Sequence, residues 1–141
     1  IGGDANLEAC LHSENRNRSN ECLKSIDHAD PSSTGIIAYS TCKAALARYV
    51  RRNAQAWGSK GVRLNAVAPG KMDTPMLDGL LTDPILSPGV TNLPYGIEAI
   101  GKPGQIGEVV EFLLMPNSSF VHGQIIYVDG GTEAILRPDL V

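Results

Sequence analysis

The chain lacks the features that mark several common classes of protein. No apolar run approaches the roughly 20 residues that a membrane-spanning helix needs. A net charge of −3 provides no basic excess for nucleic acid or for an anionic membrane surface. The three histidines have no spacing typical of metal ligands, so packing or solvated roles are favoured. We therefore expect no nucleic-acid partner, no membrane partner and no metal site.

Cysteine is also scarce. Only Cys10, Cys22 and Cys42 occur, an odd number, and no two of them form a C-x-x-C pair. This pattern favours reduced thiols in a reducing compartment, so we expect a cytoplasmic protein. We interpret Cys42 as a small packing residue.

The length of 141 residues suits one modest domain, and 43% hydrophobic content is ordinary for a globular protein. The chain begins Ile1-Gly2-Gly3 without a methionine, which we interpret as the start of a fragment.

Apolar spacing predicts the order of the elements. Residues 1–35 are polar, with two short amphipathic helices and a loop at 31–35. A helix follows, with Leu46, Val50, Ala54 and Trp57 on one face and Gly58 at its end. A buried strand is expected at 62–68, an amphipathic helix at 106–115 and a second buried strand at 124–128. Helix, strand, helix, strand predicts an α/β fold with a doubly wound parallel sheet.

The run Y-S-T-C-K at 39–43 carries the clearest chemical signal. Tyr39 and Lys43 are four residues apart, so on a helix their side chains share one face. A free tyrosine ionises only near pH ~10, and a neighbouring ammonium favours the phenolate. The pair can therefore serve proton transfer, although an exposed helix face with no function is the commoner meaning of this spacing.

Motifs later in the chain give the pair a context. Pro69-Gly70 and Thr74 form P-G-x-x-x-T after the first strand, and G-Q-I-I-Y-V-D-G-G stands at 123–131. From about Ile36 onward the chain resembles the C-terminal half of the short-chain dehydrogenase/reductase family. The runs at 56–65, 118–124 and 129–138 resemble its 3α-hydroxysteroid dehydrogenase/carbonyl reductase branch.

The resemblance implies the C-terminal part of a Rossmann-like doubly wound parallel sheet, with the N-terminal cofactor half absent. No glycine-rich dinucleotide motif occurs here, so that half is expected before Ile1. The family's catalytic serine is expected there too. Residues 1–35 then correspond to an insert before the catalytic helix, and 36–141 to part of one incomplete domain.

The resemblance also implies a reaction and the residues that carry it. The cofactor is NAD or NADP, and the reaction interconverts a hydroxyl and a carbonyl. Tyr39 would exchange the proton, and Lys43 would support it and hold the nicotinamide ribose. The remaining cofactor-binding candidates are Pro69, Gly70, Met72 and Thr74. Without the resemblance, Pro69-Gly70 could equally be a plain turn, and a turn is the preferred interpretation of Asp129-Gly130-Gly131.

The segment at 75–100 resembles the family's substrate lid, which is expected to contain short helices. Its apolar residues suit a small hydrophobic alcohol or carbonyl such as a 3α-hydroxysteroid, or they merely pack the lid on the core: Met76, Leu77, Leu80, Leu81, Ile85 and Leu86. An aromatic or aliphatic alcohol dehydrogenase of the same branch is an alternative. Because the insert could cover the catalytic helix, we expect a homodimer through 106–115 and 124–128.

A different class also stays open. The chain could be a truncated, non-catalytic fragment that serves at most as an interaction module. In either case we expect residues 1–141 alone to be inactive, because catalytic residues without a cofactor half have nothing to act with.

Overall fold

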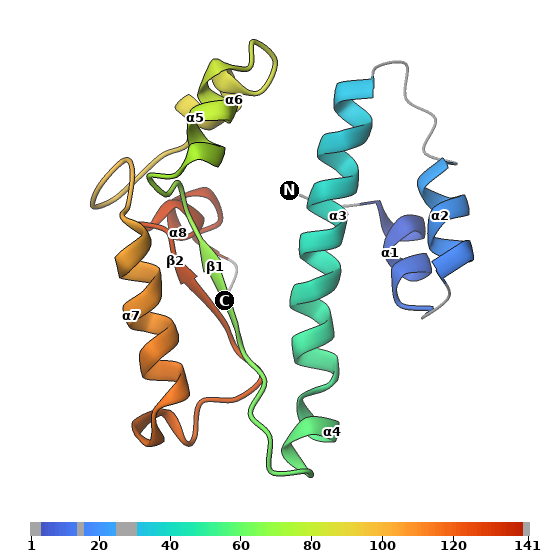
Figure 1. Cartoon of the computed structure of the whole chain (residues 1–141), viewed down its shortest axis with the longest axis vertical. Helices are drawn as coiled ribbons and strands as arrows, with labels where there is room; N and C mark the ends of the chain where they lie inside the picture. The colour runs from blue at the N-terminus through green and yellow to red at the C-terminus, as the bar shows by residue number, and fades with distance from the viewer. Residues whose placement is uncertain (1–3, 14–15, 25–30, 140–141) are drawn as a thin grey trace.

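The computed structural model describes residues 4–13, 16–24 and 31–139. The elements are, in chain order, α1 (Ala5–Leu11), α2 (Arg16–Lys24), α3 (Pro31–Arg52), α4 (Ala54–Gly58), β1 (Ala66–Pro69), α5 (Pro75–Thr82), α6 (Ser87–Thr91), α7 (Pro103–Leu114), the 3₁₀ turn η1 (Pro116–Ser118), β2 (Ile125–Val128) and α8 (Thr132–Leu136). Figure 1 shows α1, α2, α3 and α4 on one side, and the two strands with α5, α6, α7 and α8 on the other.

The two strands form a parallel pair, as the predicted α/β fold requires. Ala66 lies opposite Ile125, and Pro69 lies opposite Val128. Parallel strands need a long crossover, and α7 lies within it, running back along the sheet in Figure 1. Most residues of the sheet are only half-buried, because among the described residues each strand pairs along one edge alone.

The first strand begins at Ala66 rather than at residue 62, since side chains bond the backbone before it. His122 Nδ1 accepts the Leu64 amide at 2.9 Å, and His122 Nε2 lies 2.7 Å from the Ala54 carbonyl oxygen. The Asn65 amide group donates to the Val121 carbonyl at 2.9 Å. His122 is thus a packing histidine that joins α4 to the sheet.

Arg63 ties the same region to the end of α7. Its guanidinium donates to the Leu113 carbonyl at 2.6 Å and to the Ser118 carbonyl at 3.0 Å. The last carbonyls of a helix lack partners within it, so a cation there satisfies them. Helix α7 itself ends at Leu114, just before Pro116 as predicted, with Leu113 buried but Val110 and Leu114 exposed.

The predicted loop at 31–35 is wrong, because these residues form the first turns of α3. Proline is tolerated at the first helical position, where its missing amide costs nothing. The helix breaks at Asn53, whose side chain donates to the Tyr49 carbonyl at 2.9 Å. Helix α4 then ends at Gly58, where the sequence placed the stop.

Helices α1 and α2 confirm the two short helices expected in the insert. Leu7 is 1% exposed and packs in the α1–α3 contact together with Thr41 and Ala45. The Thr41 hydroxyl accepts the Asp4 amide at 2.9 Å, and an ion pair joins Glu8 to Arg48. The insert therefore covers one face of α3, as we expected when we placed the dimer contact elsewhere, at 106–115 and 124–128.

The expectation of three reduced thiols is wrong. Cys10 and Cys22 form a disulfide between α1 and α2, with their Cα atoms 6.5 Å apart. The odd count hid this pair, because the helical hairpin that brings the two residues together has no signature in cysteine spacing. Cys42 is exposed, which also contradicts the packing role. In the described ranges, no helix has the length and apolarity needed to span a membrane.

Candidate active site

Tyr39 and Lys43 lie together on the exposed side of α3. The Lys43 ammonium is 5.3 Å from the centroid of the Tyr39 ring, within the range of a cation–π contact. Thr41 is two residues from each, about half a turn around the helix, and is fully buried against α1. The insert thus covers the side of α3 opposite the pair and leaves Tyr39 61% exposed.

Both polar groups of the pair are available. Within the ranges that the structure describes, the Tyr39 hydroxyl has no hydrogen-bond partner and no carboxylate pairs with Lys43. Residues with helical spacing along the same stripe are also uncovered, namely Ile36 at 41% and Leu46 at 55% exposure. The expected apolar face of this helix is therefore buried only at Val50.

Pro69 and Gly70 stand at the carboxyl end of β1. The Gly70 amide donates to the Val128 carbonyl at 3.0 Å, which extends the strand pairing by one step. A Cβ at Gly70 would lie 2.6 Å from the Asp129 Cα, so a side chain has no room there. Close packing of the two strand ends thus explains this glycine without any ligand.

Met72 and Thr74 follow in the segment that leads into the lid. Met72 forms a parallel bridge with Gly101. Thr74 caps α5: its hydroxyl oxygen lies 3.4 Å from the Leu77 amide and donates to the Met72 carbonyl at 3.2 Å. The Thr74 hydroxyl therefore caps the N-terminus of α5, a structural role separate from its predicted contact with a cofactor.

The strand ends and the lid lie at one end of the molecule. In Figure 1 the upper end of β1 leads into α5 and α6, and α3 stands on the side of β1 away from α7. Parallel α/β sheets bind ligands at the carboxyl ends of their strands. The motif at 69–74 is therefore in the right place for a ligand, although among the described residues β1 pairs with β2 alone.

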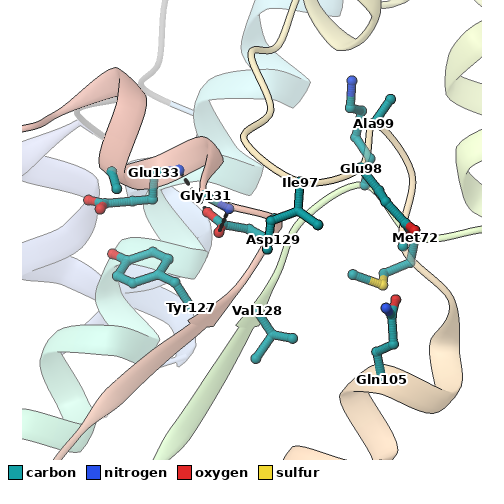
Figure 2. Close-up of a pocket in the computed structure, with 14 residues that line it drawn as sticks. Met72, Ile97, Glu98, Ala99, Gln105, Tyr127, Val128, Asp129, Gly131 and Glu133 are labelled. Carbon is teal, nitrogen blue, oxygen red and sulfur yellow. Dashed lines mark hydrogen bonds between the residues drawn. The ribbon is translucent and has the colours of Figure 1, made fainter.

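A cavity of about 560 Å³ opens beside these strand ends. Figure 2 shows Tyr127 and Glu133 on one side of it, with Met72 and Gln105 on the other. The Asp129 carboxylate is turned toward the backbone, where it accepts the Gly131 amide at 2.9 Å and the Glu133 amide at 2.7 Å. The turn predicted for Asp129-Gly130-Gly131 is confirmed, with positive φ at both glycines.

Sequence reasoning missed two residues that join the strand ends to residues 93–94: Lys71, which lines the cavity, and Thr132. The Lys71 ammonium reaches the Leu93 carbonyl at 3.4 Å, and the Thr132 hydroxyl donates to the Pro94 carbonyl at 2.8 Å. Their positions directly after Pro69-Gly70 and Asp129-Gly130-Gly131 were the available signal. Their partners are 22 and 38 residues away along the chain, which no local pattern reveals.

The lid contains short helices, as the sequence predicted, namely α5 and α6. Leu77 is buried at 7% exposure, whereas Met76 is 70% and Ile85 57% exposed. Of the two interpretations of the lid's apolar residues, packing applies to Leu77. Met76 and Ile85 instead present apolar surface that the described residues leave uncovered.

Comparison with known proteins gives consistent similarities. A sequence profile described as Enoyl-(Acyl carrier protein) reductase matches residues 11–133. A 3-alpha-hydroxysteroid dehydrogenase/carbonyl reductase from Comamonas testosteroni is 39% identical over 113 residues, covering 80% of this chain and 44% of the relative. A tropinone reductase homolog from Arabidopsis thaliana is 38% identical, over 77% of this chain and 40% of the relative.

Solved structures agree. The 3-alpha-hydroxysteroid dehydrogenase from Pseudomonas sp. B-0831, complexed with NADH, superposes with a TM-score of 0.82 at 30% identity, covering 97% of this chain and 51% of that one. A putative 2-deoxy-d-gluconate 3-dehydrogenase from Agrobacterium tumefaciens, with bound NADP, gives 0.59 at 30% identity, over 70% and 39%. The chain spans less than half the length of the curated relatives named above.

Proposed function

Because this chain belongs to the short-chain dehydrogenase/reductase family, we propose that the whole protein is an NAD(P)-dependent oxidoreductase. Its reaction would interconvert a hydroxyl and a carbonyl on a hydrophobic substrate. The observation that carries the proposal is the Tyr39–Lys43 pair, which has the family's residue types on an open helix face. The pair's place in a motif order shared with the family, before 69–74, supports the assignment.

The residues present fit a nicotinamide cofactor. Lys43 has three donors and no ionic partner in the described ranges, so it can bind ribose hydroxyls. Pro69, Gly70 and the backbone at Met72 would lie against the nicotinamide at the end of β1, with Thr74 beside them. The relatives solved with NADH and with NADP leave the choice between the two cofactors open for this chain.

Proton transfer is the part that this chain would perform. The nicotinamide, when bound, supplies or accepts the hydride. In the oxidation direction the hydroxyl proton of the substrate passes to the Tyr39 oxygen as the hydride leaves the carbinol carbon; reduction reverses both transfers. Lys43 lies beside the phenol, with its ammonium 5.3 Å from the centroid of the Tyr39 ring, and would hold the ribose of the cofactor during these steps.

The lid supports a hydrophobic substrate. Met76, Leu81 and Ile85 are exposed in the described structure, with no charged residue between Thr82 and Pro88 other than Asp83. Asp83 is turned to the backbone, where it accepts the Ile85 and Leu86 amides. An apolar lid surface of this kind suits a steroid or another bulky carbonyl, and a 3α-hydroxysteroid is the substrate we propose to test first.

The proposed assembly is a homodimer through α7 and β2. Val110 is 39% and Leu114 76% exposed on α7, and the opposite side of the molecule is occupied by the α1–α2 insert on α3. Val110→Asp should convert the dimer to monomers in sedimentation. Pairing through residues 44–57 would contradict it.

The decisive experiment follows nicotinamide absorbance in the whole protein with a panel of steroid, aromatic and aliphatic carbonyls. Tyr39→Phe should lower turnover roughly 10²- to 10⁴-fold, the usual contribution of a general acid–base group, while cofactor binding persists. Tyr49→Phe, also on α3 and 39% exposed, is the matched control and should stay active. Normal turnover in the Tyr39 variant would refute the assigned role.

A further inference from the structure

The lid at 75–100 is tied to the core at both of its ends. Where it leaves and returns, the Gly101 amide donates to the Lys71 carbonyl and the Asp73 amide donates to the Gly101 carbonyl, each at 2.8 Å. These bonds close the lid into a loop at the end of β1. They do not explain how its returning limb, residues 93–97, is held above the cavity.

The turn after β2 holds that limb. The Gly130 carbonyl accepts two amides from it, Gly96 at 2.8 Å and Ile97 at 3.1 Å. The Thr132 hydroxyl donates to the Pro94 carbonyl at 2.8 Å, with the Asp129 carbonyl also in reach at 3.0 Å. Figure 2 shows Ile97 lying directly beside Asp129 and Gly131.

The backbone of the turn at 129–131 is fixed by its glycines and by the Asp129 carboxylate. Gly130 and Gly131 have φ of 66° and 89°, values that favour glycine. The Asp129 carboxylate fixes the turn through the Gly131 and Glu133 amides. A Cβ on Gly130 would lie 3.1 Å from the Glu98 carbonyl, so the turn and the limb are also in close contact. A plain chain reversal would need none of these contacts with the lid.

Lys71 holds the limb from the other strand. Its ammonium lies 3.4 Å from the Leu93 carbonyl and 5.8 Å from the centroid of the Tyr95 ring. Both partners belong to the returning limb, and Lys71 directly follows Pro69-Gly70. The limb is therefore gripped between the ends of β1 and β2.

We propose that Lys71, Gly130 and Thr132 form a clamp that fixes the returning limb of the lid and thereby sets the affinity for substrate. This inference rests on the proposed function, because it assigns the lid to a carbonyl or alcohol substrate. The clamp residues position the lid and do not take part in hydride or proton transfer. The free part of the lid is then confined to α5, α6 and their connection, where Met76 and Ile85 are exposed.

The test compares Thr132→Val with Thr132→Ser in the whole protein. Valine keeps the shape but removes the hydroxyl, whereas serine keeps the donor. Loss of one such hydrogen bond should raise the KM for the carbonyl substrate roughly three- to tenfold, with kcat and the cofactor KM unchanged. Thr132→Ser should match the unsubstituted protein. Lys71→Met should act in the same direction as Thr132→Val, and Lys71→Arg should restore most of the affinity.

Hydrogen exchange provides a readout that needs no turnover. In Thr132→Val, exchange should quicken in peptides covering 93–101 and stay unchanged in α7 and α3. Unchanged exchange and KM in this variant would overturn the clamp, as would a rise in the cofactor KM equal to that for substrate. If the unsubstituted protein turned over no carbonyl or alcohol, the proposed function would fail, whereas the exchange measurement would still decide whether the clamp holds the limb.

Discussion

The two sides of this molecule are held together by different forces. On the helical side, α1 packs on α3 through fully buried side chains such as Leu7 and Thr41, and a disulfide joins α1 to α2. On the sheet side, β1 and β2 remain half-buried, and hydrogen bonds from Arg63, His122 and Asp129 set the geometry. The face of α3 that contacts α1 is therefore packed, whereas β1 and the face of α3 that carries Tyr39 are left largely uncovered.

The difference shows which surfaces are complete. Parallel sheets are usually covered on both faces and flanked by further strands. In the part of the chain that the structure describes, β1 pairs on one edge only, and the stripe of α3 that carries Tyr39 stands uncovered between Ile36 and Leu46. The Tyr39–Lys43 pair thus lies on a part of the surface that the described residues leave uncovered.

The largest expected effect concerns these half-buried strands. A polypeptide of residues 1–141 alone should not unfold cooperatively and should not bind a dinucleotide, because Leu64, Val67, Ile125 and Val128 are only half-buried. Circular dichroism during heating, with and without NAD or NADP, measures this. A sharp transition at low protein concentration, raised by cofactor, would show that the chain holds enough of the fold by itself.

On the helical side, Leu7→Ala should cost about 2–5 kcal/mol of unfolding free energy, since it opens a cavity in the α1–α3 contact. Leu136→Ala, in α8, removes the same atoms from a side chain that is 52% exposed and should cost well under half as much. Chemical denaturation of the whole protein compares the two variants. Equal losses would mean that α1 does not form a packed core with α3.

Removal of the disulfide should weaken the same side by about 3 kcal/mol, the value for a closed loop of about 15 residues. The variant is Cys10→Ser with Cys22→Ser, whose separation is 12 residues. Cys42→Ser is the control, because that thiol is free and exposed. Hydrogen exchange in α1 and α2 should quicken in the double variant while the sheet keeps its protection; no change in those helices would argue against the disulfide as a stabilising link.

The smallest effect is expected on the sheet side. Arg63→Met removes the donors to the Leu113 and Ser118 carbonyls and should cost about 2 kcal/mol, because water can reach a half-buried site and replace part of the loss. Arg63→Lys keeps the charge but not the fork, so it should recover only part of that stability. Denaturation curves decide it. A loss in Arg63→Met larger than that in Leu7→Ala would reverse the contrast between the two sides.

Much of the fold could be predicted from local patterns. Apolar spacing located α7, proline and glycine located the ends of α7 and α4, and the glycines after Asp129 indicated a turn with positive φ. The start of α3 was misplaced because proline and serine suit both a loop and a first helical turn. The start of β1 was misplaced because side chains make the hydrogen bonds just before it: His122 accepts the Leu64 amide, and the Asn65 side chain donates to the Val121 carbonyl.

By itself the sequence determined the α/β class and placed Tyr39 and Lys43 on one helix face, because helical and strand periods are local properties of the chain. The family followed from the resemblance of its motifs. Only the tertiary structure decided that Cys10 pairs with Cys22, that α1 covers the face of α3 opposite Tyr39, and that Lys71 and Thr132 grip the returning limb of the lid. Each of these depends on residues far apart in the chain that come together only when helices and strands pack. Local sequence periodicity carries no information about such long-range contacts.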